Sequence, residues 1–136
     1  MNAITKQCLI VTSTLLLIMS QNATADEDRV RLQCSALGVN DTSMDARYEE
    51  RRSNTKFDAS FEAAPAAGFV AGEELDVKVG GVLVGSITLI SLPGGDVGGD
   101  LGFDTRVDDN DPFPGNFPKI IKGTSVMVGN LGCALN

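Results

Sequence analysis

The amino-acid sequence predicts an all-β fold: a single small antiparallel β-sandwich, Ig-like or related, with seven or eight short strands and one disulfide. Apolar and polar side chains alternate with a period of two along most of the chain, as in strands that have one solvated face. Glycine pairs and other turn residues separate these runs, which is typical of sandwiches and small barrels. Two cysteines lie near opposite ends of this alternating region.

Residues 1–25 have the pattern of a secretory signal peptide. Lys6 supplies a positive charge, residues 8–19 form a short apolar core, and Ala23-Thr24-Ala25 has the small-x-small form of a cleavage site. This apolar run is shorter than the about 20 residues that a membrane-spanning helix needs. The alternative is an amphipathic or buried first helix. We expect cleavage after Ala25, a secreted or periplasmic protein without a membrane span, and a β-sandwich domain over residues 26–136.

Three strands are predicted where the alternation is clearest: VRLQCSA (30–36), SMDARYEER (43–51) and KFDASFEA (56–63). The polar segment RRSNT (51–55) between the second and the third favours a hairpin. The apolar side chains of both strands alternate in a way that places them on the same face when the strands pair. We therefore expect Tyr48 to face Ala59 and Ala46 to face Phe61.

A tighter hairpin is predicted over residues 74–89, ELDVKVGGVLVGSITL. Gly80-Gly81 can adopt the positive φ angles of a primed turn, which would pair Val79 with Val82 and Val77 with Val84. Three further apolar residues then fall on the opposite face: Leu83, Ile87 and Leu89. We therefore expect this hairpin to be covered on both sides.

A glycine-rich strand follows in GDVGGDLGFDTR (95–106), with Asp100 and Asp104 on its polar face. The last hairpin, TSVMVGNLGCAL (124–135), turns at Gly129-Asn130 and pairs Val126 with Cys133.

The two cysteines that remain after cleavage, Cys34 and Cys133, both fall on the apolar faces of their strands. In an oxidising compartment such a pair usually forms a bridge. We predict an intramolecular Cys34–Cys133 disulfide that brings the first and last strands together. Two free thiols or a bond between chains are the alternatives.

These segments resemble small exported bacterial β-domains of uncharacterised function. The shared pattern is a V-x-V-x-G-x-x-V-G-x-I hairpin, a glycine-rich strand that ends in (L/F)-D-T-R, and a closing G-x-x-V-x-V. The resemblance covers most of residues 46–135. It implies a β-sandwich and leaves the function open.

The acidic segment before the last hairpin offers candidate calcium ligands in Asp108, Asp109 and Asp111. Calcium accepts irregular cages of oxygen atoms, although no EF-hand spacing is present. The alternative is a solvated turn in which the aspartates bond to nearby backbone amides. Calcium is the only cofactor that the sequence suggests.

The segment PFPGNFP (112–118) carries two aromatic side chains, Phe113 and Phe117. Its prolines forbid continuous strand pairing and favour an extended course. The two rings either plug an open end of the sandwich or form a small exposed apolar patch that binds a partner.

The composition argues against several functions. The chain has no histidine, which excludes Ser–His and Cys–His nucleophile pairs and histidine-based zinc sites. The formal net charge is −7, and loss of Lys6 makes it −8 for residues 26–136, which argues against a nucleic-acid partner. Glycosidase clefts are usually lined with aromatic rings, and this chain has only one tyrosine and no tryptophan, which argues against a glycosidase.

We therefore expect a structural or adhesion-type interaction domain without catalysis, bound to an envelope or extracellular macromolecule. The alternatives are a calcium-dependent binding module that uses residues 108–111 and, less favoured, an unrecognised hydrolase.

Overall fold

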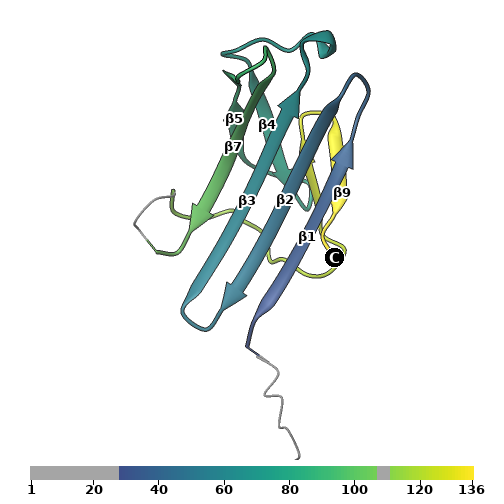
Figure 1. The fold of residues 1–136 in the computed structure, drawn as a ribbon. Coiled ribbons are helices and arrows are strands. Elements are labelled where there is room, and N and C mark those ends of the chain that lie inside the picture. Colours follow the sequence, from purple (N-terminus) through teal and green to yellow (C-terminus); the bar gives the residue numbers. More distant parts are fainter. Residues whose placement is uncertain (1–27, 107–110) are drawn as a thin grey trace, which may run out of the picture.

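The computed structural model describes residues 28–106 and 111–136, and in these residues nine strands form two antiparallel sheets (Figure 1). The five-stranded sheet has the order β1 (Val30–Leu37), β2 (Thr42–Arg51), β3 (Asn54–Ala63), β7 (Val97–Asp104) and β6 (Ile90–Ser91). The four-stranded sheet has the order β5 (Val82–Thr88), β4 (Glu74–Val79), β8 (Ser125–Val128) and β9 (Leu131–Ala134). A single turn of 3-10 helix, η1 (Pro65–Ala67), links β3 to β4.

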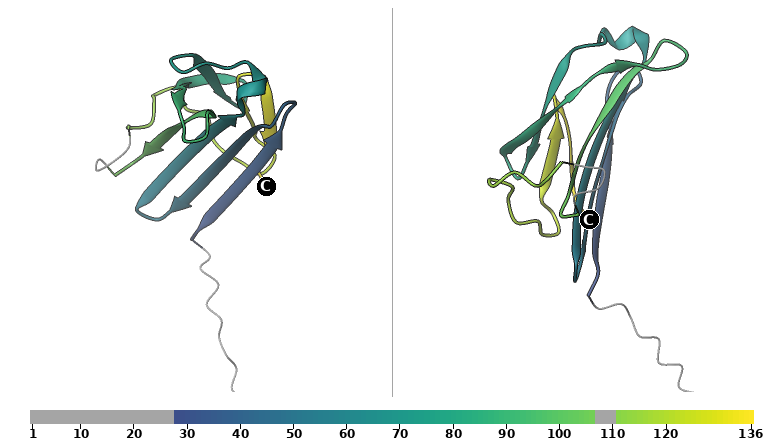
Figure 2. Two further views of the ribbon diagram at one scale, coloured as in Figure 1. Left: turned by 45° about the horizontal axis from the view of Figure 1, so that its top comes forward. Right: turned by 90° about the vertical axis from the view of Figure 1, so that its left-hand side faces the viewer.

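The two sheets lie face to face as two layers, which the right-hand view of Figure 2 shows edge-on. The all-β, disulfide-closed sandwich is therefore confirmed, with one strand more than the sequence predicts, because the two residues of β6 are too few to give a pattern. The described residues include no helix long and apolar enough to cross a bilayer. The predicted signal peptide, residues 1–25, lies outside them.

The core lies between the sheets and is built by the period-two alternation. In β3, Phe57, Ala59, Phe61 and Ala63 are buried, whereas the residues between them point away from the core. The largest fully buried side chains come from both sheets: Phe57, Met44, Ile87, Leu89, Leu135, Val77, Val79, Val126 and Val128. Burial of apolar side chains on one face of each sheet is the main force that holds the layers together.

One side of the sandwich is closed where β1 meets β9 (Figure 1). The Cys34–Cys133 disulfide joins these two edge strands, with Cα atoms 5.8 Å apart. Beside it, the backbones of Gln33 and Asn136 exchange two hydrogen bonds, with N···O distances of 3.0 and 3.1 Å. The predicted disulfide and the predicted proximity of the first and last strands are both confirmed.

The other side of the sandwich is closed by the segment from β5 to β6, which passes from one sheet to the other. The chain runs from β5 in the four-stranded sheet, through the buried Leu89, into β6 of the five-stranded sheet. The backbone of Leu89 still bonds to the four-stranded layer, because its N–H donates to the Glu73 carbonyl at 2.8 Å. One continuous segment thus supplies an edge to each sheet.

The predicted pairing of β2 with β3 is wrong by two residues. Tyr48 faces Phe57 and Ala46 faces Ala59, because the turn between the strands consists of Arg52 and Ser53 alone. A shift of two residues keeps every side chain on its predicted face, which is why the core was still predicted correctly.

The hairpin of β4 and β5 follows its prediction only next to the turn. Gly80 and Gly81 have φ angles of +56° and +82°, and Val79 pairs with Val82 as expected. Beyond this point Val77 pairs with Gly85 instead of Val84, because β5 carries a β-bulge. The extra residue returns Ile87 and Leu89 to the core side and leaves Leu83 half exposed. The expectation that this hairpin is covered on both sides is therefore wrong.

We expect the disulfide to stabilise the fold by about 2–4 kcal/mol, because it closes a long loop, with a sequence separation of 99. Denaturant unfolding with and without reductant measures this difference. The double variant Cys34→Ala/Cys133→Ala is the control and should not respond to reductant. Equal stability of the oxidised and reduced protein would contradict the prediction.

We expect Gly99→Ala to lower the free energy of unfolding by about 1–3 kcal/mol, because β7 lies directly against β5. A Cβ atom at Gly99 would lie 2.7 Å from both the Ile87 Cγ2 atom and the Thr88 carbonyl oxygen. Gly115→Ala is the matched control, since nothing lies within 4 Å of a Cβ at that position. Equal midpoints of chemical unfolding for the two variants would rule out this close approach.

Candidate functional site

The polar side chains of the five-stranded sheet form its outer face, the face turned to the viewer in Figure 1. The register arranges them in rows that run across the strands. One row consists of Ser35, Asp45, Ser60 and Asp100. The next row consists of Gln33, Arg47, Asp58 and Gly102. Adjacent members of a row are neighbours in space, because paired strands lie about 4.8 Å apart.

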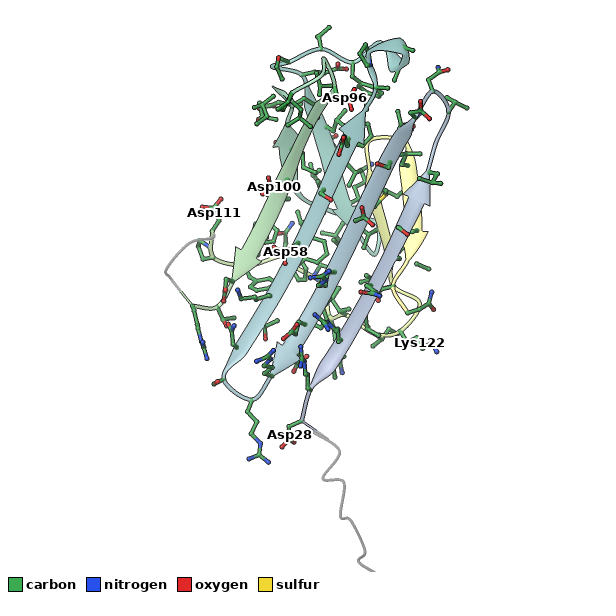
Figure 3. All side chains as sticks on the ribbon, in the orientation of Figure 1. Asp28, Asp58, Asp96, Asp100, Asp111 and Lys122 are labelled. Carbon is green, nitrogen blue, oxygen red and sulfur yellow. A yellow bond between two sulfur atoms is a disulfide. The ribbon has the colours of Figure 1, made fainter. Side chains whose placement is uncertain are left out.

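Except for Gly102, the members of these two rows line an open groove of about 640 Å³. A smaller hollow of about 210 Å³ continues it toward Ile90 and Leu92 and shares three of its residues, Asp45, Ser60 and Asp100. Small residues make the face concave, since serines and the glycines of β7 stand between longer charged side chains. We call the two connected hollows the polar groove. Figure 3 labels two of its carboxylates, Asp58 and Asp100.

Asp58 lies within the polar groove, and partial loss of hydration there raises the pKa of its carboxyl group. The positive charges of Lys56 and Arg47 oppose this rise, and the negative charges of Asp100 and Asp104 add to it. Within the described residues Asp58 forms no ion pair. The groove therefore holds negative charge that the described residues compensate only in part.

At the end of the outer face where β1 begins and β2 ends, three arginines surround one carboxylate. Glu49 lies 3.2 Å from the Arg29 guanidinium, 3.7 Å from that of Arg31 and 2.6 Å from that of Arg51. Burial alone would raise the pKa of Glu49, but hydrogen bonds and the positive charge of Arg29 and Arg51 hold it below its usual value. Among the described residues of this cluster, one negative charge faces three positive ones, so the cluster itself has a net positive charge.

Asp104 is on the predicted polar face of β7 but is only 7% exposed. Its Oδ1 atom accepts the Arg106 backbone N–H at 2.8 Å, and its Oδ2 atom lies 3.0 Å from the Lys56 Nζ atom. The bond from the Arg106 backbone and the charge of Lys56 lower the pKa of Asp104, although burial opposes this. The alternation along β7 could not predict this burial, because it depends on Lys56, which belongs to the neighbouring strand β3.

Of the predicted calcium ligands, Asp108 and Asp109 lie outside the described residues. Asp111 is exposed, and its backbone carbonyl accepts the Asp104 N–H at 3.0 Å. Nowhere in residues 28–106 and 111–136 do three potential ligands gather in a way that could hold a metal ion. Calcium binding by residues 108–111 stays a prediction.

Phe113 and Phe117 pack against the core and against each other, with ring centroids 4.8 Å apart. The Phe117 ring lies 5.3 Å from that of Phe57 and 5.9 Å from that of Phe103. The Asn116 side chain donates a hydrogen bond to the Leu83 carbonyl at 3.1 Å and so ties the segment to β5. The two rings thus have the arrangement expected of a plug, and a partner-binding role for them stays a prediction.

The described part of the chain is an all-β sandwich domain with a polar groove on one face. Comparison with known protein families, with curated proteins and with solved structures found no match to this chain.

We expect Asp104→Asn to destabilise the fold at neutral pH, because the native state lowers the pKa of Asp104. The carboxylate stabilises the fold above its unfolded-state pKa, and this stabilisation is lost as the pH falls through the lower native value. The difference between wild type and variant should therefore vanish in acid. Free energies of unfolding measured across the acid range test this prediction.

Asp58→Asn is the companion variant, because the pKa of Asp58 shifts in the opposite direction. Its stability relative to wild type should increase as the pH rises through the raised native pKa. The same pH dependence for both variants would show that the two carboxylates do not have the assigned environments.

Proposed function

We propose that this protein is secreted or periplasmic and serves as an interaction domain, without catalysis, that binds an envelope or extracellular macromolecule through the polar groove. One observation carries the proposal: an open groove crosses four strands of a rigid sheet and is lined by charged and hydrogen-bonding side chains.

The chemistry of the groove supports binding to a polar partner. Its lining includes carboxylates, serine hydroxyls, the Gln33 amide and the Arg47 guanidinium, and no aromatic ring lines the larger hollow. These groups lie on paired strands, which hold them in position before a partner arrives. A ligand that binds by stacking on rings would find no platform in that hollow, so recognition there depends on hydrogen bonds and charge.

The disulfide supports the proposed location, since bridges between structural cysteines persist in oxidising compartments outside the cytoplasm. The one tyrosine belongs to the core between the sheets. Burial and a hydrogen bond to Glu50 raise the pKa of Tyr48 to about 12, so its hydroxyl stays protonated at neutral pH. Its ring contributes to the packing between the sheets.

A capture experiment tests the groove as the binding surface. Immobilised wild-type protein is incubated with envelope extract and culture supernatant, next to the variant Asp45→Lys/Asp100→Lys. The matched control is Glu74→Lys/Asp76→Lys, which makes the same charge change at exposed positions of β4 in the other sheet. We expect the wild type and the control to retain a partner and the groove variant to lose at least about 90% of it, because charge reversal at a contact costs binding energy.

The proposal fails if the groove variant captures the same partner as the control, since the partner would then bind elsewhere. It also fails if none of the three proteins captures anything and the purified protein does not self-associate.

A further inference from the structure

We propose that the partner of the polar groove is a second copy of this chain, bound face to face with its strands antiparallel, as a dimer with two-fold symmetry. This inference rests on the proposed function and identifies the partner of the same surface. It follows from how charge is distributed along the strands of the outer face.

The outer face has an acidic half and a basic half. On the paired strands that the structure describes, the acidic half has three carboxylates and no basic side chain: Asp45, Glu62 and Asp100. On the strands of the basic half and at its margin, the described residues include six basic side chains and three acidic ones. The basic ones are Arg29, Arg31, Arg47, Arg51, Lys56 and Arg106, and the acidic ones are Glu49, Asp58 and Asp104. In Figure 3 nitrogen atoms gather over the lower part of the sheet.

Ion pairs among the described residues do not neutralise these charges. The described residues contain no ion pair to Asp45, Glu62 or Asp100. In the basic half, Glu49 is shared among three arginines. Each half therefore presents net charge to solvent, and the two halves have opposite sign.

Both halves lie on one face of one sheet, which determines the symmetry of the complex. A two-fold axis in the interface and perpendicular to the strands places the acidic half of each copy over the basic half of the other. Both contacts form at once, so the assembly closes as a dimer and does not extend into a fibre. Charged halves on opposite faces of the sandwich would instead produce an open chain.

The shape of the face agrees with this arrangement. Small side chains and glycines make the acidic half concave, and the larger hollow also reaches Arg47 and Asp58 at the margin of the basic half. The long side chains of Arg31 and Arg51 in the basic half are exposed. Each copy can therefore insert basic side chains into the polar groove of the other. Arginine guanidinium groups and carboxylates form the strongest hydrogen-bonded ion pairs, especially when they become desolvated on contact.

The size of the face predicts a weak, reversible dimer. Four strands about 4.8 Å apart, each about eight residues long at about 3.3 Å per residue, give a face of about 19 by 26 Å. Two such faces bury an area at the low end of specific interfaces. Because ion pairs dominate the contact, the dissociation constant should rise at least about tenfold between about 0.05 M and about 0.5 M salt.

Sedimentation equilibrium of the purified exported protein tests the dimer, and two variants with reversed charge test its geometry. Asp45→Lys/Asp100→Lys makes the whole face basic, and Arg31→Glu/Arg51→Glu makes it predominantly acidic. We expect each variant alone to be monomeric, because like charges meet at both contacts. An equal mixture of the two should form a one-to-one dimer at least as stable as that of the wild type.

Two controls keep the result interpretable. Glu74→Lys/Asp76→Lys should dimerise like the wild type, since it changes the same charge on the other sheet. Arg31→Glu/Arg51→Glu removes partners of Glu49, so its melting transition is checked first. If that transition is lost, Arg47→Glu/Arg106→Glu replaces it, because neither of these guanidinium groups pairs with Glu49 among the described ion pairs.

A protein that is monomeric up to about 1 mM overturns the dimer, since weaker association contributes less than about 4 kcal/mol. A dimer that both variants retain, or a mixture that stays monomeric, also overturns it. If the dimer fails but Asp45→Lys/Asp100→Lys still loses capture of another macromolecule, the interaction domain stands with a different partner. If that variant changes neither self-association nor capture, both proposals fall.

Discussion

The covalent bond between Cys34 and Cys133 fixes how the two sheets lie relative to each other. Packing between two apolar faces is non-directional and specifies the angle between layers only loosely. The disulfide and the two backbone hydrogen bonds between Gln33 and Asn136 hold the edge of one layer directly beside the edge of the other. On the opposite side, the passage of one strand through Leu89 has the same effect. The two layers are therefore joined along both sides of the sandwich.

The same alternation of apolar and polar side chains along the strands produces both the core and the outer face of the five-stranded sheet. In β3, Phe57, Ala59 and Phe61 enter the core, and the residues between them, including Asp58 and Ser60, line the polar groove. A one-residue slip of this strand would bury carboxylates and expose phenylalanines, so apolar burial strongly favours the register that builds the groove. The polar face thus gains its stability from the core beneath it.

Net charge is a poor guide to what this surface can contact. A negative total suggests that copies of the chain repel one another. However, exposed charges interact only over about 8 Å at physiological ionic strength, so a contact senses the local arrangement of charge rather than the sum. The register places most of the arginines at one end of the outer face and three uncompensated carboxylates at the other. Attraction between complementary halves can therefore exceed the general repulsion.

Strand positions, the turn at Gly80-Gly81, the last hairpin and the disulfide were predicted correctly from the sequence, because they depend on alternation, on local backbone preference and on the placement of two cysteines on apolar faces. The rest depends on neighbouring strands. The bulge at Val84 arises because β5 must bring both Val84 and Ile87 to the core. The burial of Asp104 depends on Lys56 of β3 and on the backbone of Arg106, which both contact its carboxylate. The groove exists only once four strands bring Ser35, Asp45, Ser60 and Asp100 into one row. Pairing between distant segments is a property of the tertiary structure, and local patterns in the chain contain too little information to specify it.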